Sequence, residues 1–499
     1  MKRPLRHMNS LNRIYAGAVL PALQPSTHAG LLKRFRGLER LERLPSDEVK
    51  ERQWWSLLRL IQHAYETTPF YRQRFDSIGL QPSDICSPGD LLQIPPLTRE
   101  DLRQHLEQLW SRKYHREALL SAATGGTTDS PVPLLRSADC LPEKTAVQIH
   151  LDSWAGLFPG DRVMRIWGAQ QDYPRNPSWR WRIYDRHIMR RIWAPTSLFN
   201  AEVLESHRKA LNRLRPRVIY AYPTPLALFC EHLRECGRPF HHPQSAVCTA
   251  EPLLADQRRV ITETLGCPVF EHYGSRDFGM IAGECEAHNG LHLHPTAAWV
   301  ERAPIDGSNG ELYELLITDL LNYGMPLIRY KINDCVRPGP PICPCGRGFP
   351  LIGTIEGRTT ENFYLPNGDV VPGVSLTNRV LQVCPGLKKV QVIQEAVSQF
   401  RIRYVPGSGC SIADLDLLRA NLRKFFPDGL SWEFEAVNDI KRERSGKTRF
   451  CISRVDPKNW KLPEVRDGNA RSAALAGVTE AAGSSAQVGM LRDGDRVQR

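Results

Sequence analysis

Two short apolar runs, each followed by a helical pattern, constrain the fold of this chain more than any other feature. Residues 218–221 and 246–248 are continuous apolar runs of strand length, while residues 226–233 and 253–265 carry apolar side chains at helical spacing. This alternation is typical of β-α-β units, in which helices cover a parallel sheet. Ligands of such sheets bind at the carboxyl ends of the strands. We therefore expect an α/β protein whose ligand site lies where these strands end.

The segment richest in side chains that can bind a ligand is the turn Glu-His-Tyr-Gly-Ser-Arg-Asp at residues 271–277, directly after an apolar run. The ring of Tyr273 can stack on a base, and Gly274 lets backbone come close to a ligand. Ser275 can bond a phosphate oxygen, and Asp277 can hold a hard cation such as Mg²⁺. The combination suits a nucleotide, although Tyr-Gly-Ser after a strand is also common turn chemistry.

Other segments surround this turn in a fixed order. Upstream, residues 123–131 (Ala-Thr-Gly-Gly-Thr-Thr-Asp-Ser-Pro) form a loop that can wrap phosphates with backbone N–H groups and side-chain oxygens. The other segments are 248–253 (Cys-Thr-Ala-Glu-Pro-Leu), 328–334 (Ile-Arg-Tyr-Lys-Ile-Asn-Asp), 355–358 (Ile-Glu-Gly-Arg) and 444–449 (Arg-Ser-Gly-Lys-Thr-Arg). Together they resemble the core motifs of the adenylate-forming ligase superfamily, and most closely those of the phenylacetate–CoA ligase family in its capsule-biosynthesis-like branch. Residues 60–72 also resemble that branch's N-terminal signature.

The resemblance implies the fold class. It is α/β, with a large N-terminal adenylate-forming (ANL-type) domain of parallel and mixed sheets with helices, and a small mobile α+β C-terminal domain. A chain of 499 residues is also too long for one compact core. We expect the AMP-binding domain over residues 1–357 and the lid domain over residues 358–460, where strand patterns and a helix alternate. Residues 461–499 have few large apolar side chains, which predicts a disordered tail.

Composition indicates which kinds of partner and which cellular compartment to expect. The basic residues behind the formal charge of +12 are spread along the chain, which favours a solvated basic surface or an anionic substrate over nucleic acid. Thirteen cysteines without regular spacing argue against a disulfide-stapled secreted protein, so we expect a cytoplasmic enzyme. No apolar run reaches the length of a membrane span, and Pro21 interrupts the short run at residues 14–20 that superficially imitates a signal peptide.

The resemblance also implies roles for individual residues of a nucleotide site. Tyr273 would stack on adenine, and the loop that holds Glu251 would lie against the same base. Asp334, with Arg329 and Lys331 beside it, would accept hydrogen bonds from both ribose hydroxyls. The other expected nucleotide-binding residues are Thr124, Gly125, Gly126, Thr127 and Thr128 in the phosphate loop, and Gly274 and Ser275 in the turn.

Three further residues are expected to act in the reaction. Lys447 would reach the bridging oxygens of ATP, although a lysine in a turn is by default a surface residue. Asp277 stands where the family usually has glutamate, so it keeps the charge that Mg²⁺ needs but has a shorter reach. Arg358 would begin the hinge, up to Glu361, about which the small domain rotates. Asp129 departs from the family's glycine and places a negative charge near polyphosphate, which leaves slow pyrophosphate handling open.

A second metal is expected away from the reaction. Cys343 and Cys345 form a Cys-x-Cys-Gly knuckle, and Cys285 precedes a histidine-rich stretch. Three thiolates and one imidazole give Zn²⁺ a closed tetrahedral shell, which is a structural site. Members of the branch that the chain resembles carry such a site. Its pattern selects His292 as the fourth ligand, with His288 as the rival, and free buried cysteines are the alternative.

These observations predict ATP-dependent activation of a carboxylic acid, aryl or otherwise bulky, through acyl-AMP and transfer to coenzyme A. The sequence has no self-sufficient coenzyme A signature, so an amine, a hydroxyl or a carrier-protein thiol stays open as the acceptor. A third hypothesis is a catalytically weak nucleotide-binding protein that assists surface-polysaccharide assembly, and Asp129 is its main support. The candidates for the acyl pocket, which are equally suited to the core, are Trp167, Gly168, Ala169 and residues 220–223.

Overall fold

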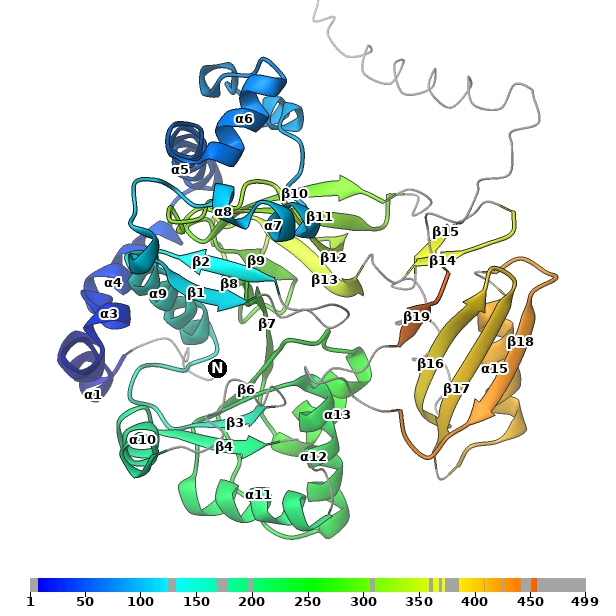
Figure 1. The fold of residues 1–499 in the computed structure, drawn as a ribbon. Coiled ribbons are helices and arrows are strands. Elements are labelled where there is room, and N and C mark those ends of the chain that lie inside the picture. The colour runs from blue at the N-terminus through cyan, green and yellow to red at the C-terminus, as the bar shows by residue number, and fades with distance from the viewer. Residues whose placement is uncertain are drawn as a thin grey trace, which may run out of the picture.

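A mixed sheet organises most of the chain (Figure 1). The structure is a computed structural model, and it describes residues 8–123, 132–167, 178–195, 201–305, 310–358, 362–367, 370–372, 386–407, 409–423, 426–440 and 450–455. Among these residues the large sheet has eleven strands in the order β10-β11-β12-β13-β9-β8-β7-β6-β5-β3-β4. The N-terminal helices and a smaller α+β unit lie at opposite sides of this sheet (Figure 1).

One half of the sheet is parallel and carries the expected β-α-β units. Its strands are β3 (Val163–Trp167), β4 (Arg191–Pro195), β5 (Val218–Ala221), β6 (Ser245–Thr249) and β7 (Val269–Ser275). The connecting helices are α11 (Ala201–Leu214), α12 (Pro223–Cys236) and α13 (Ala255–Leu265). The last two end at Gly237 and Gly266, whose φ angles of 58° and 65° are cheap only for glycine. The strands and helices expected between residues 218 and 265 are therefore confirmed.

The parallel strands are buried on both faces. One face packs against the connecting helices in an apolar core that includes Ile219, Phe229 and Ile261. The other face carries Tyr220, Val247 and Phe270, beside the residues that follow α9 (Cys140–Trp154). This double cover explains why β5 and β6 are continuous apolar runs in the sequence, without the alternation of a half-exposed strand.

The other half of the sheet is antiparallel. Its strands are β8 (Gly279–Glu284), β9 (Leu291–Leu293), β10 (Ala298–Pro304), β11 (Tyr313–Asp319), β12 (Tyr330–Pro338) and β13 (Leu351–Arg358). The strand β7 belongs to both halves, because it pairs in parallel with β6 and antiparallel with β8. The carboxyl end of β7 is therefore the point where strand direction changes, which is where ligands of such sheets bind.

Helices at the N-terminus cover one side of the antiparallel half. They are α1 (Ser10–Ile14), a π-helical stretch (Tyr15–Val19), α2 (Leu20–Leu23), α3 (Pro25–His28), α4 (Leu31–Leu41), α5 (Ser46–Thr67), α6 (Pro69–Ser77), α7 (Arg99–Gln104) and α8 (Leu106–Leu109). Pro69 lacks the N–H that would continue α5, so a new helix begins there. Leu57, Leu60 and Ile61 of α5 are fully buried.

The C-terminal part of the chain forms a smaller unit with a core of its own. The sheet order is β18 (Ser431–Ala436), β17 (Gln399–Pro406), β16 (Leu387–Ala396) and β19 (Cys451–Ser453), and α15 (Ile412–Leu422) packs on it. Two short pairs complete the described strands: β1 (Leu120–Ala123) with β2 (Pro133–Arg136), and β14 (Asn362–Tyr364) with β15 (Val370–Pro372).

Two expectations about organisation stay predictions. The boundary at residue 358 follows the last strand of the large sheet, but the division into domains at 357 and 460 is not tested by this arrangement. The expected tail, residues 461–499, lies outside the described residues. Within the described part of the chain, the helices are all too short or too polar to cross a bilayer.

The side chain of Tyr71 links the N-terminal helices to the segment that enters β12. Its hydroxyl donates to the Pro326 carbonyl at 3.1 Å and accepts from the Ile328 N–H at 2.9 Å, and the ring is fully buried. Tyr71→Phe leaves both backbone groups without this partner, so we expect a loss of about 1–3 kcal/mol in the free energy of unfolding.

Urea unfolding followed by tryptophan fluorescence measures this loss. Tyr65→Phe is the matched control, because among the described residues the Tyr65 hydroxyl bonds only the exposed Asp76 carboxylate, at 3.1 Å. We expect the control to lose less than about 1 kcal/mol. Equal losses in the two variants would contradict the role given to Tyr71.

Candidate nucleotide site and metal site

The expected adenine loop and the expected turn lie side by side at the carboxyl edge of the parallel strands. Thr249, the last residue of β6, is the register partner of His272 in β7. The chain leaves β6 through Ala250, whose φ of 71° turns the backbone sharply, and Glu251 follows. The Glu251 carboxylate accepts from the Thr224 N–H at 3.3 Å, at the start of α12. The structure thus brings together segments that the sequence placed at strand ends.

The turn after β7 has a fixed shape. The Ser275 hydroxyl oxygen accepts from the backbone N–H groups of Asp277 and Phe278, at 3.2 Å and 3.3 Å. A Cβ atom on Gly274 would lie 2.6 Å from the Gly279 carbonyl oxygen, so this position accepts only glycine. Part of the chemistry of Ser275 is therefore local to the turn, and Asp277 beside it is half-buried.

Lys144 of α9 holds the same turn from the other side, and sequence reasoning missed it. Its ammonium donates to the Phe278 carbonyl at 2.6 Å and to the Asp319 carboxylate at 2.7 Å. Arg136 of β2 adds a hydrogen bond to the Arg276 carbonyl. Both cations come from elements that follow the phosphate-loop sequence, so they connect that region to the turn. A lysine within a helix carries no motif that could have identified it.

The central contact of the site joins Tyr273 to Asp334. The Tyr273 hydroxyl donates to the Asp334 carboxylate at 2.8 Å, although three strands separate β7 from β12 in the sheet. Tyr273 is mostly buried, and Asp334 is half-buried. The register partner of Asp334 on β13 is Arg358, the first residue of the expected hinge. The residues expected to hold adenine and ribose, and the backbone of the expected hinge, are therefore neighbours.

The two basic residues near Asp334 serve other partners. The Arg329 guanidinium, almost fully buried, donates to the Glu301 carboxylate at 3.0 Å and to the Ile94 carbonyl. Lys331 forms an ion pair with Glu314 at 2.9 Å. Lys331 and Glu314 lie on the adjacent strands β12 and β11, and Arg329 joins the residue before β12 to β10, so these side chains stabilise the sheet near the site.

Glu271 supports the adenine loop, a function that the sequence did not reveal. Its carboxylate accepts from the Leu253 N–H at 3.3 Å, and its own N–H donates to the Glu284 carboxylate at 2.9 Å. Arg258 compensates this acidic pair by donating to both Glu284 oxygens at 3.0 Å. Burial, with the nearby Glu284 charge, raises the pKa of Glu271 to about 7. An acidic residue inside an apolar strand is the signal that could have marked it.

The aromatic candidates for the acyl pocket form a cluster at the ends of β3 and β5. The ring centroids of Trp167 and Tyr222 are 4.8 Å apart, and those of Trp167 and Tyr220 are 6.0 Å apart. Tyr220 is buried, and its hydroxyl lies 3.4 Å from the Nδ1 atom of His272. Burial lowers the pKa of His272 to about 4, so the ring is neutral at physiological pH. Tyr220 and Tyr222 are both buried, while Trp167, the last residue of β3, is half-buried.

Several expected residues lie outside the described part of the chain. They are Thr124, Gly125, Gly126, Thr127, Thr128 and Asp129 in the phosphate loop, Gly168 and Ala169 near the acyl pocket, Glu361 in the hinge, and Lys447. Arg358 is described as the last residue of β13.

The expected metal ligands form one buried cluster. The ligand atoms of Cys285, His292, Cys343 and Cys345 all lie within 4.8 Å of one another. The sulfurs of Cys285 and Cys343 are 3.5 Å apart, and His292 Nε2 lies 3.3 Å from the sulfur of Cys345. Tetrahedral zinc bonds would separate such atoms by about 3.5–3.8 Å. The donor set and its spacing thus fit a closed zinc shell.

Of the two candidate histidines, His292 faces the thiols of the cluster and His288 has other partners. The Nδ1 atom of His292 lies 3.2 Å from the Phe349 carbonyl, which leaves Nε2 facing the thiols. A metal-bound histidine commonly has such a second partner. The Nδ1 atom of His288 instead lies 3.4 Å from the Glu284 carboxylate, and the ring packs on Phe270, with ring centroids 4.9 Å apart. The structure therefore separates the two candidates and favours His292.

A buried polar network surrounds the cluster. Arg347, two residues after Cys345, donates to the Glu42 carboxylate at 3.0 Å and lies over the Trp154 ring. The Trp154 indole N–H also donates to Glu42, at 2.9 Å. This network ties the chain after α4, the helix α9 and the Cys-x-Cys knuckle together.

Comparisons with known proteins agree with this architecture. Residues 363–454 match the family model described as the CapK C-terminal domain. Protein CapK of Staphylococcus aureus is 22% identical over 74% of this chain and 81% of that protein. A phenylacetate-coenzyme A ligase of Thermus thermophilus is 27% identical over 66% of this chain and 75% of that protein. A solved structure of 2-hydroxyisobutyryl-CoA ligase with R3-HIB-AMP covers 89% of this chain and 94% of that one, with a TM-score of 0.65 and 18% identity.

The chain is similar to CapK and to the phenylacetate–CoA ligases over about two thirds or more of its length. The expected family relationship is thereby confirmed. The likeness to 2-hydroxyisobutyryl-CoA ligase shows the fold alone, and it confirms the expected α/β class of the ANL type. The expected enzyme class, an AMP-forming acid–thiol ligase, is also borne out by these relatives.

Metal analysis of the purified protein tests the zinc site. We expect about one equivalent of Zn²⁺, and we expect Cys343→Ser to lose the metal and to lower the unfolding temperature. Structural zinc is commonly worth on the order of 10 kcal/mol, so its loss cannot be silent. Cys86→Ser is the control, because Cys86 is exposed and lies outside the cluster. Less than about half an equivalent of zinc, with Cys343→Ser as stable as the control, would end the proposal.

Proposed function

We propose that this protein activates a carboxylic acid with ATP, forms an acyl-AMP and transfers the acyl group to coenzyme A. The observation that carries the proposal is the contact of Tyr273 with Asp334 at 2.8 Å, at the edge of the sheet where strand direction changes. The relatives named phenylacetate-coenzyme A ligase support the acid and the acceptor. A cytoplasmic location, with free access to ATP and coenzyme A, belongs to the same proposal.

Each proposed residue answers one requirement of this reaction. The aromatic ring of Tyr273 binds adenine, and Asp334 accepts from the ribose hydroxyls while the Tyr273 hydroxyl fixes its carboxylate. The loop of Glu251 lies against the base, held by Thr224 and by Glu271. Because the ring and the carboxylate are fixed before ATP arrives, binding costs less conformational entropy.

Charge neutralisation is the second requirement, because the attacking carboxylate and the α-phosphate are both anions. Thr124 to Thr128 would bind the phosphates with N–H and hydroxyl groups. Asp277 would hold Mg²⁺, which supplies a positive charge for the phosphate oxygens. Lys447 would neutralise the bridging oxygens as pyrophosphate leaves. Arg358 would start the hinge that moves Lys447 away before the thioester forms.

The acid is proposed to be aryl or otherwise bulky, because the rings of Trp167 and Tyr222 meet where β3 and β5 end, at the carboxyl ends of the parallel strands. The zinc cluster is proposed to be structural, because its four protein donors leave no position for a substrate. Zinc would fix the knuckle, and it takes no part in acid activation.

Two alternatives follow from specific observations. The acceptor can instead be an amine, a hydroxyl or a carrier-protein thiol. The match to the CapK C-terminal domain, with Asp129 in the phosphate loop, supports a weakly active accessory protein of surface-polysaccharide synthesis.

Acid-dependent exchange of pyrophosphate into ATP, measured over a panel of acids, tests the proposed reaction. We expect exchange with a subset of bulky acids, and consumption of acyl-AMP only when coenzyme A is added. Exchange without any effect of coenzyme A would support another acceptor. No exchange with any acid would support the accessory function.

Substitution of Asp334 tests the nucleotide site. We expect Asp334→Ala to raise the apparent KM for ATP by at least about tenfold, because the ribose contacts exist in the ground state and the transition state alike. Tyr273→Phe keeps the ring and loses only the hydrogen bond, so a rise of a few-fold is expected. Asp256→Ala, on the exposed surface of α13, is the control. An unchanged KM in Asp334→Ala would remove this residue from the site.

Substitution of Lys447 tests the first half-reaction separately from the second. We expect Lys447→Ala to reduce pyrophosphate exchange by about 10²–10³, the typical loss for one preorganised donor. Thioester formation from supplied acyl-AMP should largely survive, because that step does not use the lysine. Lys441→Ala is the control from the same segment of sequence. Equal loss in both half-reactions would assign Lys447 a different role.

A further inference from the structure

The N-terminal segment contains far fewer acidic residues than the rest of the chain. Residues 1–38 contain no Asp or Glu, and the first 45 residues hold nine Lys or Arg against two Glu. This segment therefore carries a net charge of +7 out of the formal +12 of the whole chain. The proposed nucleotide and metal sites use none of its basic side chains.

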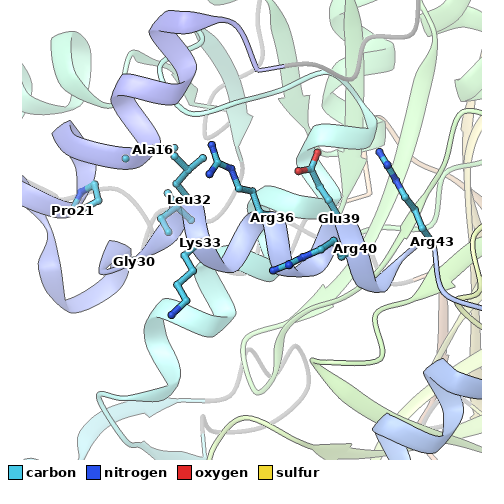
Figure 2. A pocket seen from close by; sticks show the side chains of 11 residues that line it. Ala16, Pro21, Gly30, Leu32, Lys33, Arg36, Glu39, Arg40 and Arg43 are labelled. Carbon is cyan, nitrogen blue, oxygen red and sulfur yellow. The ribbon is translucent and has the colours of Figure 1, made fainter.

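Basic side chains of α4 and of Arg43, just after the helix, line a groove, with Glu39 as the one acidic residue among its lining residues. It has a volume of about 770 Å³ and lies between α4 and the preceding helices, which contribute Ala16 and Pro21 to its lining (Figure 2). Lys33, Arg36, Arg40 and Arg43 follow one another at spacings of three, four and three residues, and all are exposed. Within the described part of the chain, these four make no ion pair. The neighbouring Arg34, in contrast, is paired with Glu143 at 2.7 Å.

The helices that precede α4 also expose large apolar side chains. Leu11, Ile14 and Leu23 are 46%, 55% and 51% exposed, although the same helices have buried residues that fix them to the large sheet region. Asn12, fully buried, donates to the Pro159 carbonyl at 2.8 Å. The apolar side chains therefore project from an anchored support and not from a loose end.

We propose that this N-terminal surface docks on a membrane that contains anionic phospholipids. Unpaired basic side chains attract the phosphates of such lipids, and each is worth about fivefold in partitioning near the surface. Exposed Leu and Ile side chains can enter the interface between headgroups and acyl chains, which is how surface-bound helices gain affinity. Nucleic acid is disfavoured as the partner because the groove has no aromatic ring for base stacking among its lining residues.

The position of the surface leaves the reaction free. The helices α1, α3 and α4 lie on the side of the large sheet opposite the small α+β unit (Figure 1). A protein that docks through these helices keeps the edge with Tyr273 and the small unit in the aqueous phase. Docking would thus place the enzyme at a lipid surface without blocking the entry of substrates.

Vesicle co-sedimentation of the full chain tests the proposal and needs no enzymatic activity. We expect binding to phosphatidylcholine vesicles that contain phosphatidylglycerol, little binding to pure phosphatidylcholine, and a strong decrease at high salt. The double variant Arg36→Glu with Arg40→Glu should bind at least about 25-fold more weakly. Leu11→Ser with Leu23→Ser should weaken the binding that persists at high salt.

The matched control is Lys209→Glu with Arg213→Glu, a pair of exposed basic residues with the same spacing on α11. It changes the net charge equally, so it should bind within about twofold of the unchanged protein if the groove is the site. Thermal unfolding verifies that all variants fold. The proposal would be overturned if the protein did not bind anionic vesicles, or if the control variant lost as much binding as the groove variant. It would also be overturned if the protein bound a short DNA duplex more tightly than the vesicles in a competition experiment.

Discussion

The hydrogen bond between Tyr273 and Asp334 depends on nearly every part of the large sheet. The two residues are 61 positions apart and lie on strands that are not neighbours. Their contact forms only when the parallel and antiparallel halves take their places around β7. Gly274 permits the tight return after β7, Lys144 fixes that return, and Tyr71 fixes the entry to β12. The geometry proposed for nucleotide binding is therefore a property of the folded sheet, not of one loop.

The sequence predicted the parts of this arrangement that depend on local pattern. Continuous apolar runs identified β5 and β6 because both faces of these strands are covered, and the ends of such strands located Glu251 and Tyr273. Interactions that depend on strand register could not be predicted. Nothing in the local sequence pairs Arg329, just before β12, with Glu301, which lies 28 residues away on β10. Glu271 stands out in the sequence as an acidic residue inside an apolar strand, but its partner, the Leu253 N–H in the adenine loop, is known only from the fold.

At the metal cluster, residue spacing in the sequence is not enough to identify the fourth ligand. His288 and His292 are both near Cys285 in sequence, and composition alone does not separate them. The strand β9 separates them, because it carries His292 inward toward the knuckle while His288 stays in the preceding turn beside Glu284. The surrounding network of Glu42, Arg347 and Trp154 then joins the knuckle to the N-terminal helices. A charged group buried there is stable only while its partners remain, so the cluster and these helices stabilise each other.

The number of basic residues in the chain does not show where an excess of positive charge lies on its surface. Basic residues are indeed spread along the chain, so their number gives no reason to single out a surface. The number of acidic residues does vary along the chain. They balance most of the basic residues elsewhere, and they are absent from the first 38 positions. Because an ion pair neutralises attraction for a partner, the unpaired stripe on α4 differs physically from paired arginines such as Arg34 and Arg258. A charged docking surface is therefore recognised by missing counter-charges, which requires both the sequence balance and the contacts of the fold.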